Sequence, residues 1–288
     1  MQYGGIELGG TKIVCGYTDE NNLLIDRITI PTTSPKETLE KCKEYFITNK
    51  VSSLGIASFG PIDPNKNSKT YGYITSTPKP NWENVDVVSY FKELDIPISF
   101  DTDVNGACLG EVKYGAGKGL SNVIYGTIGT GIGFGIYLNN NLVHGLLHPE
   151  TGHMLIQKHE IDKDFIGPCP YHDNCLETLA SGTSIKKRYN KSARDLYDND
   201  SVWQLESYYL GQAMVNCILN YSPEKIILGG GVMHNENLLK LVKEKTINLL
   251  NGYIKSEIIN DIDNYIVLPK LGDDAGVIGA IELGKQLI

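Results

Sequence analysis

Cysteine and histidine side chains gather in the middle of the chain at a spacing that suits a metal ion. Cys169, His172 and Cys175 follow one another as C-x2-H-x2-C. Thiolate and imidazole ligands at this spacing favour tetrahedral Zn²⁺. The fourth ligand must then come from a residue such as His153 or His159. The alternative interpretation is that both cysteines are free thiols in the core and that the histidines lie on the surface.

Two carboxylates flank this cluster in the sequence. Glu150 opens the run Glu150-Thr-Gly-His153, and Glu177 follows two residues after Cys175. Carboxylates on both sides of a metal-binding loop suggest that the metal would shape a polar pocket.

Composition excludes several classes of protein. The chain has 288 residues, with 26 basic and 34 acidic side chains and a net charge of −8. No basic block occurs, which argues against nucleic acid as a partner. The first residues lack the pattern of a signal peptide, and no apolar run approaches the roughly 18 residues of a membrane span. We therefore expect a cytoplasmic protein, with the four remaining cysteines in its core: Cys15, Cys42, Cys108 and Cys217.

The first part of the chain predicts three antiparallel strands, then a helix, a strand, a second strand and a second helix. Runs of apolar residues between turn residues indicate the strands, and Ser34 with Pro35 caps the first helix. The expected elements are strands Tyr3–Leu8, Ile13–Thr18 and Leu23–Ile30 with a turn at Asp19–Asn22, a helix to Asn49, strands Ser53–Ser58 and Pro97–Asp101, and helix Val104–Tyr114.

A similar order recurs about 120 residues later. Its expected elements are strands Asn122–Ile128, Ile132–Leu138 and Leu142–His144, strand Lys225–Leu228, helix Asn235–Asn251, strand Tyr265–Pro269 and helix Ala275–Leu287. This repetition predicts a duplicated α/β fold of two domains facing each other across a cleft. We expect one domain at 1–118 plus 272–288 and a larger one at 119–271. A single large domain is the alternative.

Glycine-rich turns in both halves predict contacts with phosphate groups. The run from Gly129 to Gly135 does not match the dinucleotide fingerprint, because it continues into a strand rather than a helix, and no Walker A motif occurs. Glycine turns between strands still let backbone N–H groups approach phosphate oxygens closely. Residues expected at such positions are Gly9, Gly10, Thr11 and Lys12, then Gly129, Thr130 and Gly131; Gly229, Gly230 and Gly231 would form a floor for adenine or ribose.

Four segments together resemble the ROK family of sugar kinases and repressors, which has the actin/hexokinase-type (ribonuclease H-like) fold. They are Glu7–Lys12, Asp101–Glu111, Gly129–Gly133, and Glu150–His153 with the cysteine cluster. Within the family, the segments Thr75–Trp82, Asp101–Asp103 and Cys169–Cys175 are most similar to zinc-containing bacterial fructokinases. The resemblance implies ATP-dependent phosphorylation of fructose, with Mg²⁺ accompanying ATP, in an interdomain cleft of a homodimeric enzyme.

The resemblance also implies residue roles. Asp103 would be the general base, because it follows a strand and opens a helix; alternatively it only caps that helix, and Asp101 is a weaker candidate for the base. Glu150, His153 and Glu177 would bind sugar hydroxyls, with Thr102, Gly60 and Trp82 also at the sugar; alternatively, Trp82 only packs at the edge of the domain. Zinc would be held by His153, Cys169, His172 and Cys175.

Two departures from the family pattern bear on these roles. The commoner family cluster is C-x-C-x4-C, with three cysteines, so the ligand set here differs. Family glucokinases have Asn before the catalytic Asp, whereas this chain has Thr102, which favours fructose over glucose. The alternatives are a hexokinase for glucose, mannose or an amino sugar, and a sugar-responsive repressor. A repressor would need a helix-turn-helix before the strand at Tyr3.

Overall fold

The computed structural model describes residues 1–19, 21 and 24–288, which form two compact units. The first unit comprises Met1–Gly119, Leu142–Pro149 and Lys270–Ile288, and the second comprises Leu120–Asn141 and Glu150–Pro269. The segment Leu142–Pro149 thus belongs to the first unit, whereas the sequence-based boundaries placed it in the other domain. The expected turn at Asp19–Asn22 and the start of the strand at Leu23 lie partly outside the described residues.

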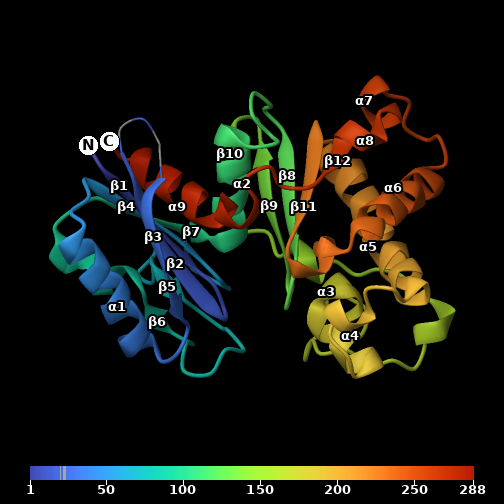
Figure 1. Ribbon diagram of the computed structural model, residues 1–288, viewed down its shortest axis with the longest axis horizontal. Helices are drawn as coiled ribbons and strands as arrows, with labels where there is room; N and C mark the ends of the chain where they lie inside the picture. Colours follow the sequence, from blue (N-terminus) through green and yellow to red (C-terminus); the bar gives the residue numbers. More distant parts are fainter. Residues whose placement is uncertain (20, 22–23) are drawn as a thin grey trace. The chain divides into compact units, whose positions relative to one another are not determined.

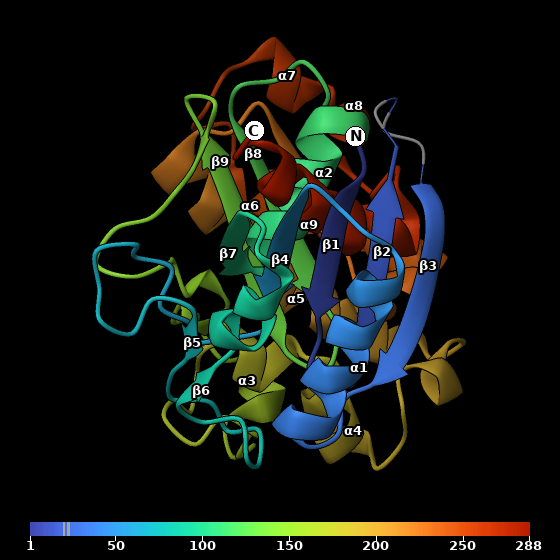
Figure 2. The ribbon, with the colours of Figure 1, turned by 90° about the vertical axis from the view of Figure 1, so that its left-hand side faces the viewer.

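The first unit is built on a five-stranded sheet in the order β3-β2-β1-β4-β7 (Figure 2). Its strands are β1 (Tyr3–Leu8), β2 (Lys12–Thr18), β3 (Leu24–Pro31), β4 (Ser53–Ser58) and β7 (Ile98–Thr102). β1 pairs antiparallel with β2 and parallel with β4, which in turn pairs parallel with β7. Parallel β4 and β7 therefore end at the same edge of the sheet, where Asp103 follows.

Helices cover both faces of this sheet (Figure 1). Helix α1 (Pro35–Thr48) begins after Ser34, whose side chain accepts a hydrogen bond from the Glu37 N–H, as expected of an N-cap. On the other face lie α2 (Asp103–Tyr114) and α9 (Ala275–Lys285). Gly55 permits α9 to lie against the strands, because a Cβ there would be 1.8 Å from the carbonyl oxygen of Ala280.

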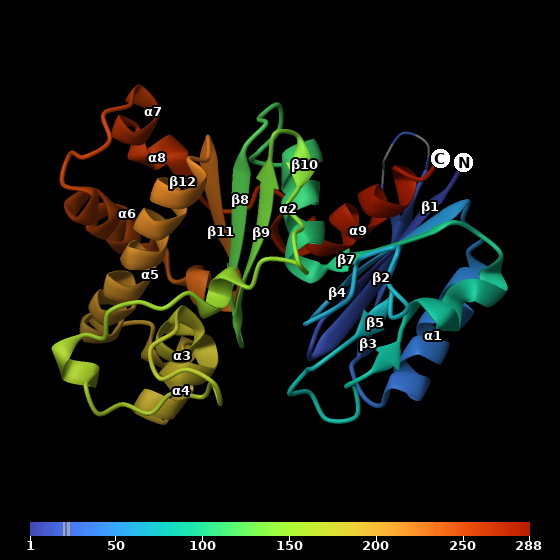
Figure 3. The ribbon, with the colours of Figure 1, turned by 180° about the vertical axis from the view of Figure 1, so that it is seen from behind.

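The second unit repeats the same arrangement, with its sheet in the order β10-β9-β8-β11-β12. Its strands are β8 (Val123–Ile128), β9 (Ile132–Leu138), β10 (Asn141–Leu142), β11 (Lys225–Gly229) and β12 (Ile266–Val267). Helices α5 (Asp200–Tyr221) and α6 (Glu236–Leu250) lie together on one side of it (Figure 3). The duplicated α/β fold predicted from the sequence is therefore present. The strand predicted at Leu142–His144 is wrong beyond Leu142, because the chain leaves this sheet there.

Shorter elements complete the described chain. They are β5 (Tyr73–Ile74), β6 (Val85–Asp86), α3 (Leu176–Ala180), α4 (Gly182–Tyr189), α7 (Glu257–Asn260), α8 (Ile262–Tyr265) and six 3₁₀ helices, η1 (Val88–Leu94), η2 (Thr151–His153), η3 (Glu160–Asp162), η4 (Arg194–Leu196), η5 (Gly231–His234) and η6 (Gly272–Asp274). Among the helices described, none has the length and apolar character needed to cross a membrane. The four cysteines outside the histidine-rich loop are all fully buried, as predicted.

Candidate active site and metal-binding loop

Asp103 lies where β7 meets α2, and its side chain is not the cap of that helix. The cap is Thr102, whose Oγ1 accepts a hydrogen bond from the Asn105 N–H at 3.1 Å. The Asp103 carboxylate instead accepts a hydrogen bond from the adjacent Val104 N–H, at 2.8 Å. Burial raises the pKa of Asp103 to about 6, although backbone hydrogen bonds oppose the shift. A carboxylate with such a pKa is well suited to accept a proton near neutral pH.

Glu7 is a second partly buried carboxyl group in the first unit, and no role was predicted for it from the sequence. Burial, followed by repulsion from Asp103, raises the pKa of Glu7 to about 7, and Lys12 partly offsets the shift. Its carboxylate packs against the start of α9, where a Cβ on Gly276 would lie 2.2 Å from the Glu7 side chain. The signals available in the sequence were its place as first residue of the ROK-like segment Glu7–Lys12 and its position three residues before Gly10.

Asp101 precedes Asp103 by two residues and has a different environment. Its Oδ1 accepts hydrogen bonds from the Thr102 N–H at 2.7 Å and from the Asn105 amide at 2.8 Å. Its Oδ2 lies 2.9 Å from Nε2 of His144. Because both oxygens of Asp101 are engaged, Asp103 is the better candidate for a base.

The glycine turns have the geometry of tight hairpins. In the first turn, the Gly9 N–H donates to the Lys12 carbonyl at 3.1 Å, and a Cβ on Gly10 would meet no heavy atom within 4 Å. Thr11 and Lys12 are exposed. The backbone at Gly10 is therefore open to a ligand, as a phosphate-binding turn requires.

The second turn, at Gly129-Thr130-Gly131, is held by the start of α4. The Gly182 N–H donates to the Gly129 carbonyl at 2.7 Å, and the Thr183 hydroxyl donates to the Thr130 carbonyl at 2.7 Å. A Cβ on Gly182 would lie 2.8 Å from the same Gly129 oxygen, so the helix approaches closely because residue 182 is glycine.

The third glycine run follows β11. Gly230 has a φ of +90°, and a Cβ there would lie 2.5 Å from the Ile128 carbonyl oxygen, so glycine is required at this position. Gly231 would meet no heavy atom within 4 Å, whereas Gly229 packs on Tyr125 and Pro269. Gly231 is therefore the most open member of the run.

The loop between η2 and α3 brings four potential zinc ligands together. One ligand atom each from His153, Cys169, His172 and Cys175 lies within 4.8 Å of the others. Nδ1 of His153 is 3.5 Å from the Cys175 sulfur and 3.8 Å from the Cys169 sulfur, which is 3.7 Å from Nδ1 of His172. Zn–S bonds of about 2.3 Å and Zn–N bonds of about 2.0–2.1 Å give tetrahedral edges of about 3.3–3.8 Å. The donor set and its spacing thus fit Zn²⁺.

His159, the alternative fourth ligand, lies outside this group. Its Nδ1 accepts a hydrogen bond from the Ile161 N–H at 3.2 Å, and its ring packs against Tyr208. The chain therefore brings His153, rather than His159, to the cysteines.

Glu177 connects the metal-binding loop to the second glycine turn. Its Oε2 accepts a hydrogen bond from the Ile132 N–H at 2.9 Å, and its Oε1 lies 3.9 Å from Nε2 of His153. Because Nδ1 of His153 faces the cysteines, Nε2 is the nitrogen left to face Glu177 and a ligand. The residue before His153 must be glycine for the chain to pass this close to β9, since a Cβ on Gly152 would be 1.9 Å from the Ile132 carbonyl oxygen.

Known proteins are similar to this chain over its whole length. Residues 3–287 match the ROK family. The chain belongs to the ROK family. It is 45% identical to the fructokinase of Lactococcus lactis subsp. cremoris, over 99% of this chain and 96% of that one. It is 44% identical to the fructokinase of Pediococcus pentosaceus, over 100% and 99%. Among solved structures, the ROK hexokinase from Thermus thermophilus superimposes with a TM-score of 0.83 at 23% identity, over 100% and 99% of the two chains.

Three further residues that the ROK resemblance placed at the sugar have distinct surroundings. Trp82 is fully buried; it packs on Phe59 and its indole N–H donates to the Thr33 carbonyl at 2.9 Å. The Trp82 ring therefore packs in the interior of the first unit and does not present an exposed face to a sugar. Gly60 faces His148, whose Nε2 would be 3.5 Å from a Cβ at that position. Thr102 is buried, with its hydroxyl oxygen accepting the helix-capping hydrogen bond.

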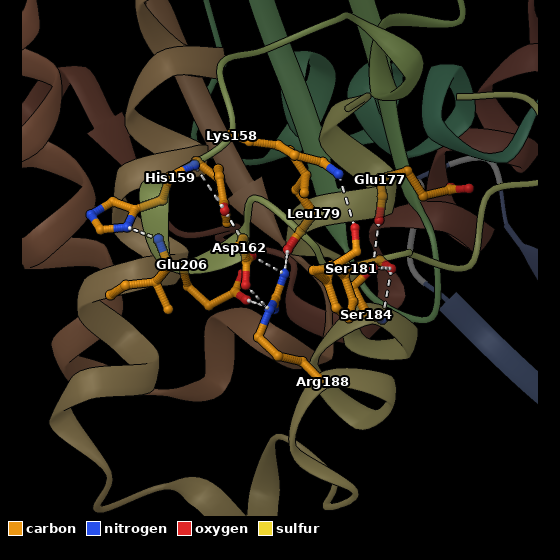
Figure 4. A network of polar contacts seen from close by, with 12 residues as sticks. Lys158, His159, Asp162, Glu177, Leu179, Ser181, Ser184, Arg188 and Glu206 are labelled. Atoms are coloured by element: carbon orange, nitrogen blue, oxygen red, sulfur yellow. Dashed lines mark hydrogen bonds and ion pairs between the residues drawn. The ribbon is translucent and has the colours of Figure 1, made fainter. Parts of the chain in front are cut away.

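A buried ionic network lies next to the loop that carries the four potential zinc ligands, His153 to Cys175 (Figure 4). Asp162, on η3, accepts hydrogen bonds from the Arg188 guanidinium at 2.8 and 3.1 Å and from the Tyr209 hydroxyl at 2.7 Å. Arg188 also donates to the Leu179 carbonyl at 2.7 Å, and lies 3.5 Å from Glu206. The network thus ties the loop to α3, α4 and α5.

Proposed function

We propose that this protein is a fructokinase, which transfers the γ-phosphoryl group of ATP to O6 of D-fructose. The observation that carries the proposal is the full-length similarity, at 44–45% identity, to the two fructokinases above. The partly buried carboxylate of Asp103, at the junction of β7 and α2, supports the proposal, because this chemistry needs a base.

In the proposed mechanism, Asp103 accepts the proton of the fructose 6-hydroxyl while O6 of fructose forms a bond to the γ-phosphorus of ATP. The bond between that phosphorus and the β–γ bridging oxygen breaks, and ADP leaves. Bound Mg²⁺ would neutralise the phosphate charge. Backbone N–H groups of the turns at Gly10 and Gly131 would contact the phosphates, and the run ending at Gly231 would lie against adenine or ribose.

For sugar binding, we propose that Glu150, His153 and Glu177 hold hydroxyl groups of fructose. Glu177 and Nε2 of His153 already face each other at 3.9 Å, a separation that leaves room for a hydroxyl to bond both. We further propose Zn²⁺ at His153, Cys169, His172 and Cys175. The ion would order the loop and fix the tautomer of His153.

A coupled assay of ADP release tests the sugar assignment. We expect kcat/KM to be higher for fructose than for glucose, because Thr102 replaces the Asn of family glucokinases, and we expect fructose 6-phosphate as the product. Mannose and amino sugars complete the panel. Equal or reversed preference would assign the protein as a hexokinase of another specificity.

We also propose that the enzyme is a cytoplasmic homodimer. The ROK resemblance implies the dimer, and the acidic composition, with a net charge of −8 and no basic block, disfavours a nucleic-acid-binding role. Light scattering coupled to gel filtration would determine the mass in solution, and a mass equal to one chain of 31.7 kDa would contradict the dimer.

A further inference from the structure

The segment Leu142–Pro149 carries two histidines that contact the first unit through opposite hydrogen-bond roles. His144 presents Nε2 to the buried carboxylate of Asp101 at 2.9 Å. Four residues later, Nε2 of His148 accepts a hydrogen bond from the Ile62 N–H at 3.1 Å. One histidine is therefore a donor and the other an acceptor.

Each contact reaches a part of the first unit to which we assigned a role in the reaction. Asp101 shares its other oxygen with the Thr102 N–H and the Asn105 amide, at the turn that carries Asp103. Ile62 follows Gly60 and Pro61 in the loop after β4, and the Thr75 N–H donates to the Pro61 carbonyl at 2.8 Å. His144 thus contacts the carboxyl end of β7, and His148 contacts the loop that follows β4, the neighbouring parallel strand.

We propose that His144 and His148 are positioning residues of the phosphoryl-transfer reaction: His144 orders the Asp101–Asp103 turn, and His148 orders the Gly60–Ile62 loop. Neither histidine is required to touch substrate. The proposal rests on the proposed function, because Asp103 and Gly60 have their roles from it. Glu150, a proposed sugar ligand, follows His148 by two residues in the sequence.

The protonation states of the two histidines agree with these roles. The hydrogen bond to Asp101 raises the pKa of His144, against the effect of burial. Burial lowers the pKa of His148, with a smaller contribution from His144, while Asp101 and a backbone hydrogen bond at Pro149 oppose the shift. Above its pKa, His148 is neutral and accepts the Ile62 N–H. As pH falls through that pKa, Nε2 gains a proton and the bond is lost.

Fructose binding measured by calorimetry tests the role of His148. His148→Phe keeps a ring but removes the acceptor, and we expect the Kd for fructose to rise about tenfold at about pH 7.5. The Kd for a non-hydrolysable ATP analogue should change much less. His148→Gln retains a non-titrating acceptor, so it should restore most of the affinity. Its Kd should also rise less than that of wild type between about pH 7.5 and about pH 5.5, while titration of Asp103 affects both proteins alike.

A matched pair tests His144. His144→Phe removes the donor to Asp101, and we expect kcat to fall about tenfold, whereas His144→Gln, which can donate, should recover most of it. Leu146→Ala controls for general loosening, because this side chain is 99% exposed on the same segment. Circular dichroism checks that each variant is folded.

The outcomes separate this proposal from the proposed function. Unchanged fructose affinity in folded His148→Phe, no recovery in the Gln variants, or an equal loss in Leu146→Ala would overturn the positioning roles. If wild type phosphorylates a different hexose, the fructokinase assignment fails, and the same variants measured with that hexose decide the positioning proposal.

Discussion

Thr102 rather than Asp103 caps helix α2, which leaves the Asp103 carboxylate available for its proposed role as the base. Thr102 supplies the cap oxygen to Asn105, and Asp103, as the first residue of α2, keeps its carboxylate for another partner. The position between a strand end and a helix start also stabilises negative charge, which partly offsets burial. Glu7 adds a nearby carboxyl group that disfavours a second negative charge.

We predict that Asp103→Asn lowers kcat by about 10²–10⁴-fold, while the fold and ATP affinity are retained, since removal of a general base leaves bound geometry intact. In wild type, kcat/KM should fall as pH drops below about 6, because the raised pKa of Asp103 leaves the base protonated there. Steady-state rates from about pH 5 to about pH 9 measure both effects. Turnover near that of wild type in purified Asp103→Asn would leave Asp103 without a catalytic role.

At the scale of elements, the network of Asp162, Arg188 and Glu206 holds the metal-binding loop against three helices. Arg188 is 7% exposed and stacks on Phe165 at 4.3 Å, so its charge depends on these carboxylates for compensation. Glu206 is fully buried, and its Oε2 has no hydrogen-bond partner in the described chain. Burial therefore raises the pKa of Glu206 to about 8, despite the attraction of Arg188.

This shift makes stability depend on pH. The folded pKa of Glu206 exceeds its ordinary value of 4.5, so the native state holds a proton that the unfolded chain releases, and stability falls as pH rises from about 4.5 to about 8. We predict that Glu206→Gln reduces this fall by about 1–3 kcal/mol. Denaturant unfolding at several pH values measures it. The exposed Glu37→Gln on α1 is the control, and a slope unchanged in Glu206→Gln would mean that Arg188 keeps Glu206 ionised.

The metal-binding loop should depend on zinc. Structural zinc sites contribute about 10–16 kcal/mol of apparent binding energy in small peptides, enough to order a loop such as this one. We predict that strong chelators lower both Tm and sugar affinity, while ATP affinity changes less because the glycine turns lie in other segments.

Metal analysis of protein purified without added zinc tests whether these four residues bind the ion. We expect one equivalent in wild type and in His159→Gln, and a loss in His153→Gln and Cys169→Ser, because His159 is bonded elsewhere in its own loop. Less than about a tenth of an equivalent in active wild-type protein, roughly the level of adventitious metal, would reject the site.

At the scale of the whole molecule, the C-terminal helix returns to complete the first unit. Helices α2 and α9 cross at Gly106 and Gly279, where a Cβ on Gly279 would lie 1.6 Å from the Gly106 carbonyl oxygen. The side chain of Tyr114 on α2 also donates to Glu282 on α9 at 2.8 Å. The first unit thus contains a close backbone contact between α2 and α9, two helices that lie far apart in the sequence.

We predict that Gly279→Ala destabilises the protein by about 1–3 kcal/mol or more, because the added methyl group forces the two helices apart. Gly145→Ala is the matched control, since a Cβ there would meet no heavy atom within 4 Å. Thermal and denaturant unfolding compare the two. Equal stability of both variants would show that the helices separate at little cost.

The sequence alone determined the features that depend on neighbouring residues. Strand and helix periodicity predicted both sheets and the repeated element order, the strand–helix junction singled out Asp103, and the spacing of Cys169, His172 and Cys175 placed three potential ligands in one loop. Only the tertiary structure decided that His153 rather than His159 joins them, that Trp82 is buried, that the chain after Leu142 leaves the second sheet, and that Glu7 lies beside Asp103. Local spacing fixes which side chains share a turn or face, whereas contacts between distant segments depend on the path of the whole chain, which no local pattern encodes.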